Sequence, residues 1–256
     1  MKEILIYTGI FFFGAAWGSF FHALSVRYIE KGFSGRIIET LTARSRCTAC
    51  EAAIKPWNLI PVLSYIILRG RCPGCKAKIS ASYPAAEILY GIVLLSCIIK
   101  FGLNFYSFNL FLLISVSILI AFIDIKTMTI PDIFIILFFI LSAYPVILNS
   151  NPKDNLFGLG IMTAAFLIIL LIFPGSFGGG DLKYAAAIGF FLGIDLSIIA
   201  LETSLISGAV FGLGYSAVKK TGLKIKIPFA PFLTIGIITA IYLGKELMFL
   251  YFSFIN

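Results

Sequence analysis

Long apolar runs separated by short polar segments dominate the pattern of this chain. A helix that spans a membrane needs about 20 mostly apolar residues, and eight runs come near or exceed that length: 4–24, 83–101, 106–124, 131–149, 155–174, 181–197, 198–218 and 229–250. The sixth and seventh runs are continuous, and only Gly193 and Asp195 indicate a turn, in which we expect Asp195 to lie. No small-residue cleavage site follows the first run, so we expect a retained anchor and not a secretion signal. The pattern predicts an all-α polytopic membrane protein with about eight transmembrane helices.

Composition supports a membrane environment. Apolar residues make up 60% of the 256 residues and charged residues 12%, against roughly 45–50% and about 25% in soluble globular proteins. A chain with so few charges cannot cover a water-facing surface, so lipid must be its main solvent. The formal net charge of +8 would suggest nucleic acid as the partner of a soluble protein. In a membrane protein, such an excess more often sets topology.

The distribution of basic residues indicates which side faces the cytoplasm. Sixteen of the 20 Lys and Arg residues lie on one side, in 25–82, 125–130, 175–180 and 219–228 and at Lys183, which can snorkel to that face. The four on the other side are Lys2, Lys100, Lys153 and Lys245. Because basic residues are retained inside, we expect both termini outside, the lipid bilayer as a partner and no nucleic acid.

Four cysteines form two pairs in segment 25–82, Cys47-Thr-Ala-Cys50 and Cys72-Pro-Gly-Cys75. Two C-x2-C pairs supply four sulfur ligands for a tetrahedral zinc ion, and a full set of protein ligands leaves no place for a reacting water. A domain this small usually needs such a staple. Disulfides are disfavoured in a reducing compartment, and no thioredoxin-like pattern supports a redox pair. The spacing predicts a small cytoplasmic domain with a structural zinc.

Two aspartates lie at matched positions at the inner ends of apolar runs. Asp124 ends the third run, and Asp181 begins the sixth within Gly178-Gly-Gly-Asp-Leu-Lys183. The predicted topology places both at the same depth, where ionisable groups are expected to be functional. Two carboxylates that share a site cannot both ionise, so one stays protonated while the other deprotonates water. Gly178 and Gly180 allow a peptide substrate to approach the backbone closely, so the pair predicts an aspartic peptidase.

Other polar residues have simpler interpretations. Asp181 could instead be the N-cap of its helix, and Asp132 stabilises the first turn of another helix. His22, the single histidine, lies at the end of the first run and needs no catalytic explanation. Glu87 and Glu202 lie within the runs, and their spacing assigns them no role.

These motifs resemble those of the type IV prepilin peptidases, membrane aspartic proteases of the G-x-G-D kind. Six motifs follow in the family's order: Gly18-Ser19-Phe20, the paired C-x-x-C motifs, Tyr83-Pro84-Ala-Ala-Glu87, Asp124 with Ile130-Pro-Asp132, Gly178-Gly-Gly-Asp-Leu-Lys183 and Ile227-Pro-Phe-Ala-Pro-Phe232. The chain departs from the family's pattern at His22, where asparagine is usual, and at Ser82, where arginine is usual.

The resemblance implies cleavage of prepilins and of type II secretion pseudopilins at the cytoplasmic face of the bacterial inner membrane, after a glycine that ends a short basic leader. It implies that Asp124 and Asp181 are the catalytic aspartates. It also implies N-methylation of the new amino terminus with S-adenosylmethionine, a step associated with the cysteine domain. There, Gly70-Arg71 matches a glycine–basic pair of the family, although the pair could simply shape the zinc knuckle.

The motifs divide the chain into three predicted parts: a first transmembrane helix (1–24), a cytoplasmic zinc-binding domain associated with methyl transfer (25–82) and a seven-helix aspartic peptidase domain (83–256). Three alternatives remain. A peptidase-only member would lack methyl transfer, and a presenilin-like intramembrane aspartyl protease would leave the zinc domain unexplained. An ion-coupled transporter would favour acids at the bilayer centre, whereas Asp124 and Asp181 lie at the ends of runs.

Overall fold

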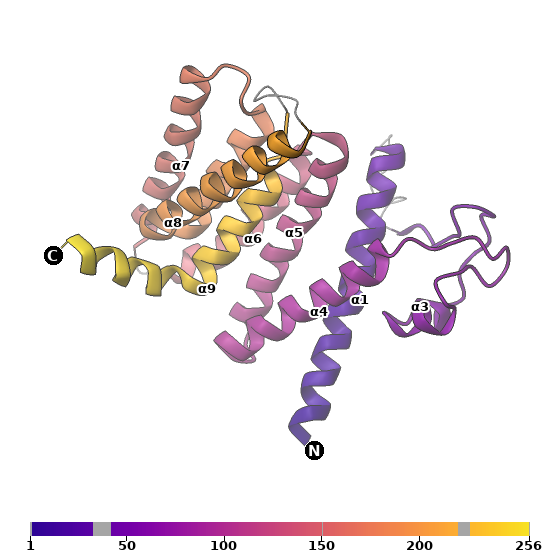
Figure 1. Ribbon diagram of the computed structural model, residues 1–256. Helices are drawn as coiled ribbons and strands as arrows, with labels where there is room; N and C mark the ends of the chain where they lie inside the picture. Colours follow the sequence, from indigo (N-terminus) through magenta and orange to yellow (C-terminus); the bar gives the residue numbers. More distant parts are fainter. Residues whose placement is uncertain (1, 33–41, 150, 220–225, 256) are drawn as a thin grey trace. The chain divides into compact units, whose positions relative to one another are not determined.

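Helices account for the regular structure of the described part of the chain. The computed structural model describes residues 2–32, 42–149, 151–219 and 226–255. Its long helices follow in the order α1 (Lys2–Lys31), α4 (Ser82–Phe101), α5 (Phe105–Thr127), α6 (Asp132–Leu148), α7 (Pro152–Ile172), α8 (Gly179–Lys219) and α9 (Ala230–Ile255) (Figure 1). Within the described ranges, six of these helices are long and apolar enough to cross a membrane, and α6 is shorter. The prediction of an all-α polytopic membrane fold is confirmed.

The sixth and seventh predicted spans form one element, α8, which is broken at Gly193. This residue has φ 74° and ψ −174°, and glycine adopts a positive φ without steric cost. At the break, Oδ1 of Asp154 on α7 accepts a hydrogen bond from the N–H of Ile194 at 3.2 Å, which satisfies a backbone group that the break frees. Asp195 lies in the helix after the break, so the expectation that it lies in a turn is wrong. The number of eight spans remains a prediction.

The chain divides into two compact units, Met1–Phe111 and Leu112–Asn256. In the first unit, α1 and α4 pack closely because a glycine lies between them: a Cβ added to Gly18 would lie 2.8 Å from the Cβ of Tyr90. Small residues commonly allow membrane helices to approach each other. The Gly-Ser-Phe motif of the first predicted span therefore includes a helix-packing position.

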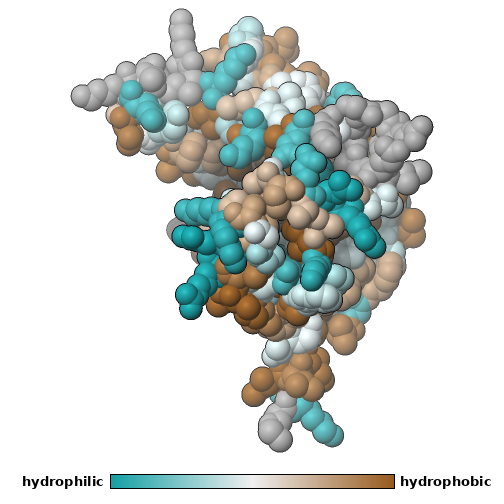
Figure 2. Space-filling model, turned by 90° about the vertical axis from the view of Figure 1, so that its right-hand side faces the viewer, coloured by the Kyte–Doolittle hydropathy of each residue, from teal (hydrophilic) through white to brown (hydrophobic). Residues whose placement is uncertain are grey.

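The second unit contains the greater part of α5 together with α6, α7, α8 and α9. Oγ1 of Thr234 on α9 donates a hydrogen bond to the carbonyl of Ser117 on α5 at 3.1 Å, and Gly158 on α7 lies against Gly189 on α8. Apolar side chains such as Leu119 are fully buried, yet many other large apolar side chains are exposed. Hydrophobic surface is also visible on the face that Figure 2 draws. Such exposure is expected where lipid is the solvent.

The cysteine-bearing segment lies in the first unit, between α1 and α4. Its described part contains the short helices η1 (Pro56–Leu59) and α3 (Leu63–Ile67). Residues 33–41 of the predicted zinc-binding domain lie outside the described residues, as do three basic residues that entered the topology argument: Arg36, Lys220 and Lys224. The predicted domain boundaries after residues 24 and 82 stay a prediction.

Candidate active site and metal centre

Asp124 occupies the last turn of α5, where it is 4% exposed. Its Oδ2 accepts a hydrogen bond from the backbone N–H of Ala230, the first residue of α9, at 3.0 Å. The first N–H groups of a helix have no partner within the helix, and the helix dipole favours negative charge there. The Pro-Phe-Ala-Pro-Phe motif thus supplies a donor to Asp124, a role that the sequence did not indicate.

Asp181 occupies the first turn of α8 and is partly buried. Its Oδ2 accepts a hydrogen bond from the N–H of Gly178 at 2.8 Å. This bond is one half of a capping box, in which the third helical residue reaches back to the residue before the helix. Asp181 therefore stabilises the start of α8 from inside the helix and is not its N-cap residue. It also lies close enough to Asp124 for the two carboxylates to interact electrostatically.

The two glycines of the predicted motif have different surroundings. A Cβ added to Gly180 would lie 3.0 Å from the Cβ of Ile130, in the segment that precedes α6. A Cβ added to Gly178 would meet nothing closer than Oδ2 of Asp181, at 3.5 Å. Close approach of another segment therefore explains the glycine at 180, while a side chain at 178 would fit beside the aspartate.

Two phenylalanines link the backbone donors of the two aspartates. Phe177 precedes Gly178 and Phe229 precedes Ala230, and their ring centroids lie 4.6 Å apart in an edge-to-face arrangement. The ring of Phe166 on α7 contacts both, at 4.9 Å and 5.9 Å. Aromatic pairs of this kind contribute about 0.5–1.5 kcal/mol beyond the burial of their area. The cluster holds the starts of α8 and α9 together, and the sequence did not reveal it.

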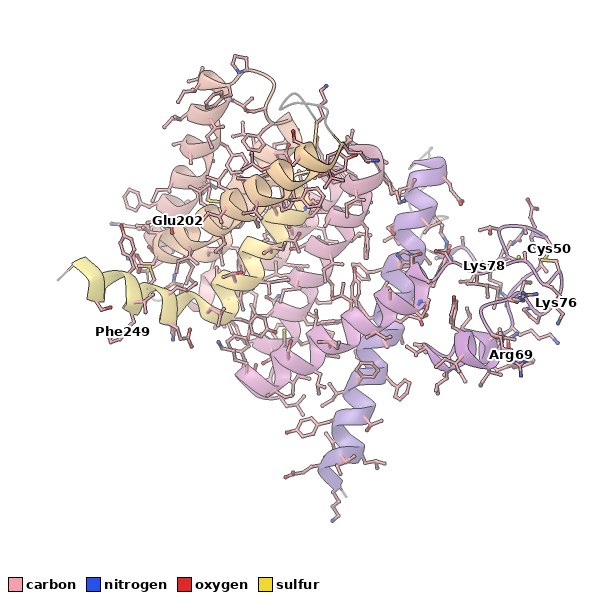
Figure 3. The ribbon with its side chains drawn as sticks, in the orientation of Figure 1. Cys50, Arg69, Lys76, Lys78, Glu202 and Phe249 are labelled. Atoms are coloured by element: carbon pink, nitrogen blue, oxygen red, sulfur yellow. The ribbon has the colours of Figure 1, made fainter. Side chains whose placement is uncertain are left out.

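Lys183 and Asp132 form an ion pair between the starts of α8 and α6. Nζ of Lys183 lies 2.9 Å from both carboxylate oxygens, and the two side chains are 59% and 62% exposed. Exposed pairs contribute about 0–1 kcal/mol, so this one adds little stability. The sequence assigned Lys183 to the headgroups and Asp132 to its own helix, and it did not predict the pair. Glu202 is exposed on α8 (Figure 3).

The four predicted cysteine ligands come together in one cluster. Their sulfur atoms all lie within 4.8 Å of one another, and Sγ of Cys47 lies 3.8 Å from Sγ of Cys75. Tetrahedral zinc with Zn–S bonds of about 2.3 Å requires sulfur atoms about 3.8 Å apart. Figure 3 labels Cys50 on this segment, at the right of the view. The cluster can hold a metal ion, and its dimensions fit a tetrahedral site.

The two cysteine pairs have the same local structure. The N–H of Cys47 donates to the carbonyl of Ala52 at 3.0 Å, and the N–H of Cys72 donates to the carbonyl of Ala77 at 2.9 Å. In both pairs, the residue after the second cysteine has a positive φ: Glu51 at 55° and Lys76 at 61°. Each pair therefore forms a tight turn that directs two sulfur atoms to one side, as a metal-binding knuckle requires.

The thiols of the cluster differ in how readily they ionise. The N–H groups of Ala49 and Cys50 lower the pKa of the Cys47 thiol to about 6. At Cys75, the N–H of Ala77 acts in the same direction, but the neighbouring thiols and desolvation outweigh it and raise the pKa to about 11. Metal ligation requires thiolates, and a bound divalent cation would offset their mutual repulsion.

Gly70 and Arg71 lie directly before the second knuckle. Gly70 is buried with φ 63°, its N–H donates to the carbonyl of Tyr65, and its carbonyl accepts from the N–H of Ile79 at 2.8 Å. A Cβ on Gly70 would lie 2.9 Å from the hydroxyl of Tyr65. Gly70 thus shapes the knuckle, while the side chain of Arg71 is exposed.

The two positions that depart from the family's pattern contact each other. Nε2 of His22 on α1 and Oγ of Ser82 at the start of α4 lie 3.0 Å apart, within hydrogen-bond distance. The imidazole also packs edge-to-face on the ring of Tyr83, with centroids 4.7 Å apart. His22 therefore belongs to a contact between α1 and α4, and the sequence gave no indication that it would meet Ser82.

Comparison with known proteins matches the chain to two family models in succession. Residues 12–101 match the bacterial peptidase A24 N-terminal domain, and residues 111–213 match the type IV leader peptidase family. A prepilin leader peptidase/N-methyltransferase of Bacillus subtilis is 32% identical over 247 residues, which cover 94% of this chain and 96% of the relative. A relative with the same name from Legionella pneumophila is 31% identical, and the match covers 82% of this chain and 76% of the relative. Another from Aeromonas salmonicida is 32% identical, and the match covers 83% of this chain and 76% of the relative. No solved structure matches. A similarity that extends over nearly the whole length of a relative shows that the chain belongs to the type IV leader peptidase family.

Proposed function

We propose that this chain removes the leader peptide from type IV prepilins and pseudopilins and then N-methylates the new amino terminus. The observation that carries the proposal is the arrangement of Asp124 and Asp181. Each lies at a helix end, each has one oxygen held by a backbone N–H, and the residues that precede the two donors, Phe177 and Phe229, pack against each other. The relatives share the name prepilin leader peptidase/N-methyltransferase, which supports both activities.

Peptide hydrolysis would divide between the two aspartates. The ionised carboxylate takes a proton from water, whose oxygen attacks the scissile carbonyl carbon while the protonated carboxyl donates to the carbonyl oxygen. The tetrahedral intermediate then breaks its C–N bond as a proton passes to the leaving nitrogen. The N–H groups of Ala230 and Gly178 each hold Oδ2 of one carboxylate, which leaves the second oxygen of each carboxyl group available for the reaction. Gly180 and Lys183 would support the start of α8, which carries Asp181.

The four cysteines, Cys47, Cys50, Cys72 and Cys75, would hold a structural zinc. The short sulfur–sulfur distances and the paired turns support this assignment. Four protein ligands fill a tetrahedral shell, so the ion would stabilise the domain and take no part in the reaction.

Methyl transfer would use S-adenosylmethionine as the donor, which supplies an electrophilic methyl group to the new amino nitrogen. Gly70 and Arg71 are the proposed residues for this step. The exposed guanidinium of Arg71 is accessible to the carboxylate of such a donor, and Gly70 sets the turn that presents it. In this proposal, segment 25–82 serves methyl transfer, 83–256 serves proteolysis, and 1–24 anchors the first part.

The chain would reside in the bacterial cytoplasmic membrane with both termini outside. Six candidate spans in the described ranges support a multi-pass protein. The excess of Lys and Arg in the segments around the cysteines and both aspartates supports a cytoplasmic position for these sites. Prepilins would then meet the aspartates at the inner face of the membrane.

Mass spectrometry of a co-expressed prepilin tests both activities. We expect loss of the leader and a gain of one methyl group with the wild-type chain. Asp124→Asn and Asp181→Asn should each abolish leader loss, whereas Asp195→Asn, an exposed aspartate of α8, should not. Cleavage at the wild-type rate in either of the first two variants would refute the mechanism. A cleaved but unmethylated product would establish a peptidase-only enzyme.

A further inference from the structure

Exposed apolar side chains gather on the short helices of the cysteine-bearing segment. This apolar patch consists of five residues of η1, α3 and the turn between them: Trp57, Ile60, Leu63, Ile66 and Ile67. Ile66 and Ile67 are 64% and 77% exposed. A cluster of large exposed apolar side chains on a small domain marks an interaction surface.

A hydrogen bond fixes the start of α3 beside a membrane helix. The N–H of Val62, which precedes α3, donates to Oε2 of Glu87 at 2.7 Å. Glu87 is 7% exposed and lies in the second turn of α4, about 8 Å along the axis from the first residue of that helix. The apolar patch is therefore held level with the first turns of a candidate membrane span.

The backbone at this contact is strained. Val62 has φ 62° and ψ −50°, and the N–H of Leu63 donates to the carbonyl of Pro61 at 2.6 Å. These values describe a γ-turn with a positive φ at its centre, a rare and strained conformation that is costly for a β-branched residue. Such strain persists only where surrounding contacts hold it, and here the buried carboxylate of Glu87 accepts the N–H of the strained residue. Glu87, which the sequence left unassigned, positions α3.

Basic side chains lie in the same segment as the apolar patch. Five exposed cations lie in the same segment: Lys55, Arg69, Arg71, Lys76 and Lys78. None of the five forms an ion pair with another residue in the described ranges. Nζ of Lys55 lies 5.4 Å from the centroid of the Trp57 ring, and Figure 3 labels Arg69, Lys76 and Lys78 on this segment. Figure 2 views the molecule from this side and shows hydrophilic surface next to hydrophobic surface.

We propose that the apolar patch inserts into the lipid interface and that the exposed cations of the same segment bind anionic headgroups. Tryptophan and basic side chains around an apolar surface are typical of membrane interfaces, and each Lys or Arg near an anionic surface adds to the attraction. The hydrogen bond to Glu87 holds the apolar patch beside the first turns of α4, and this position favours lipid as the partner of the patch. A prepilin leader is a poorer occupant because it is itself basic and the same cations would repel it. This inference does not rest on the proposed peptidase activity.

Quenching of tryptophan fluorescence by brominated lipid tests the insertion. The chain has two tryptophans, and Trp17→Phe, which costs no described hydrogen bond, leaves Trp57 as the single reporter in the full-length chain. In nanodiscs with brominated acyl chains, we expect strong quenching of Trp57 in membranes that contain phosphatidylglycerol. Pure phosphatidylcholine membranes should give weaker quenching, and added salt should reduce the difference.

Two sets of variants separate the apolar and the ionic contributions. Ile66→Ser with Ile67→Ser changes only exposed side chains and should reduce quenching in both membranes. A triple variant with Arg69→Gln, Lys76→Gln and Lys78→Gln should show the same quenching of Trp57 in membranes with and without phosphatidylglycerol. Lys153→Gln, an exposed cation of α7, is the matched control and should leave quenching unchanged.

Three results would overturn the proposal. The first is an absence of quenching in every membrane, and the second is quenching that neither set of variants changes. The third is protection of Trp57 from quenching by an added prepilin peptide while phosphatidylglycerol has no effect, since that result would assign the apolar patch to the substrate. Leader cleavage measured on the same nanodiscs reports separately on the proposed activity.

Discussion

The hydrogen bond from Ala230 to Asp124 can be removed without altering the carboxylate. Ala230 is the first residue of α9, a position that tolerates proline because proline's fixed φ suits the helix and the first N–H has no partner within it. In this chain the N–H does have a partner, since it donates to Oδ2 of Asp124 at 3.0 Å. Ala230→Pro therefore deletes one donor to a buried carboxylate and keeps the helix.

The expected effect follows from the energy of that bond. A hydrogen bond to a charged group contributes about 1.5–3 kcal/mol, and about 1.4 kcal/mol corresponds to a tenfold change in rate. We therefore expect kcat/KM for leader cleavage to fall about 10- to 150-fold in Ala230→Pro. The assay is cleavage of a purified prepilin by the enzyme in nanodiscs. Because Ala230 is fully buried, the melting temperature of each variant is measured alongside.

Ala230→Gly is the matched control because it keeps the N–H and removes only a methyl group. We expect it to cleave at nearly the wild-type rate. Wild-type cleavage by a folded Ala230→Pro enzyme would refute the role of this donor. An equal loss of activity in both variants would show that packing around Ala230, and not the hydrogen bond, supports the reaction.

Three further changes test other contacts. Gly180→Ala should slow cleavage more than Gly178→Ala, because an added Cβ would lie 3.0 Å from the segment before α6 only at the first position; equal rates in the cleavage assay would contradict this. Phe177→Ala should lower the melting temperature and the cleavage rate together, since the ring pair it removes contributes about 0.5–1.5 kcal/mol; an unchanged rate would show that the aromatic cluster does not position the aspartates. Cys72→Ser should lose zinc in metal analysis of the purified chain, whereas Cys97→Ser, which lies outside the cluster, should retain it. Wild-type protein purified without chelators and free of zinc would refute the metal assignment.

Features that depend on local sequence could be predicted. A membrane span requires a continuous apolar run, and each predicted run coincides with a helical segment of the described chain. The cysteine cluster could also be predicted, because each C-x2-C pair forms its own turn. The break in α8 was only weakly indicated, since the residues on both sides of Gly193 are apolar, and Asp154 of another helix stabilises it.

Features that depend on distant partners could not be predicted. The donor to Asp124 lies 106 residues away in the sequence, and the two members of the Lys183–Asp132 pair are 51 residues apart. Nothing in the sequence around Ala230 or Asp132 indicates which residue it will contact. The sequence indicated that both aspartates lie at helix ends. The backbone groups that donate hydrogen bonds to them depend on how the helices pack, which the sequence did not indicate.

The contact between His22 and Ser82 shows how packing changes the interpretation of a family comparison. Taken by position, the two residues are separate departures from the family's pattern, 60 residues apart, yet they lie within hydrogen-bond distance in a partly buried site. The two departures therefore meet in one contact between α1 and α4, which border the cysteine-bearing segment. Asp124 and Asp181 lie in the other compact unit. We therefore expect this alteration to affect methyl transfer before it affects proteolysis.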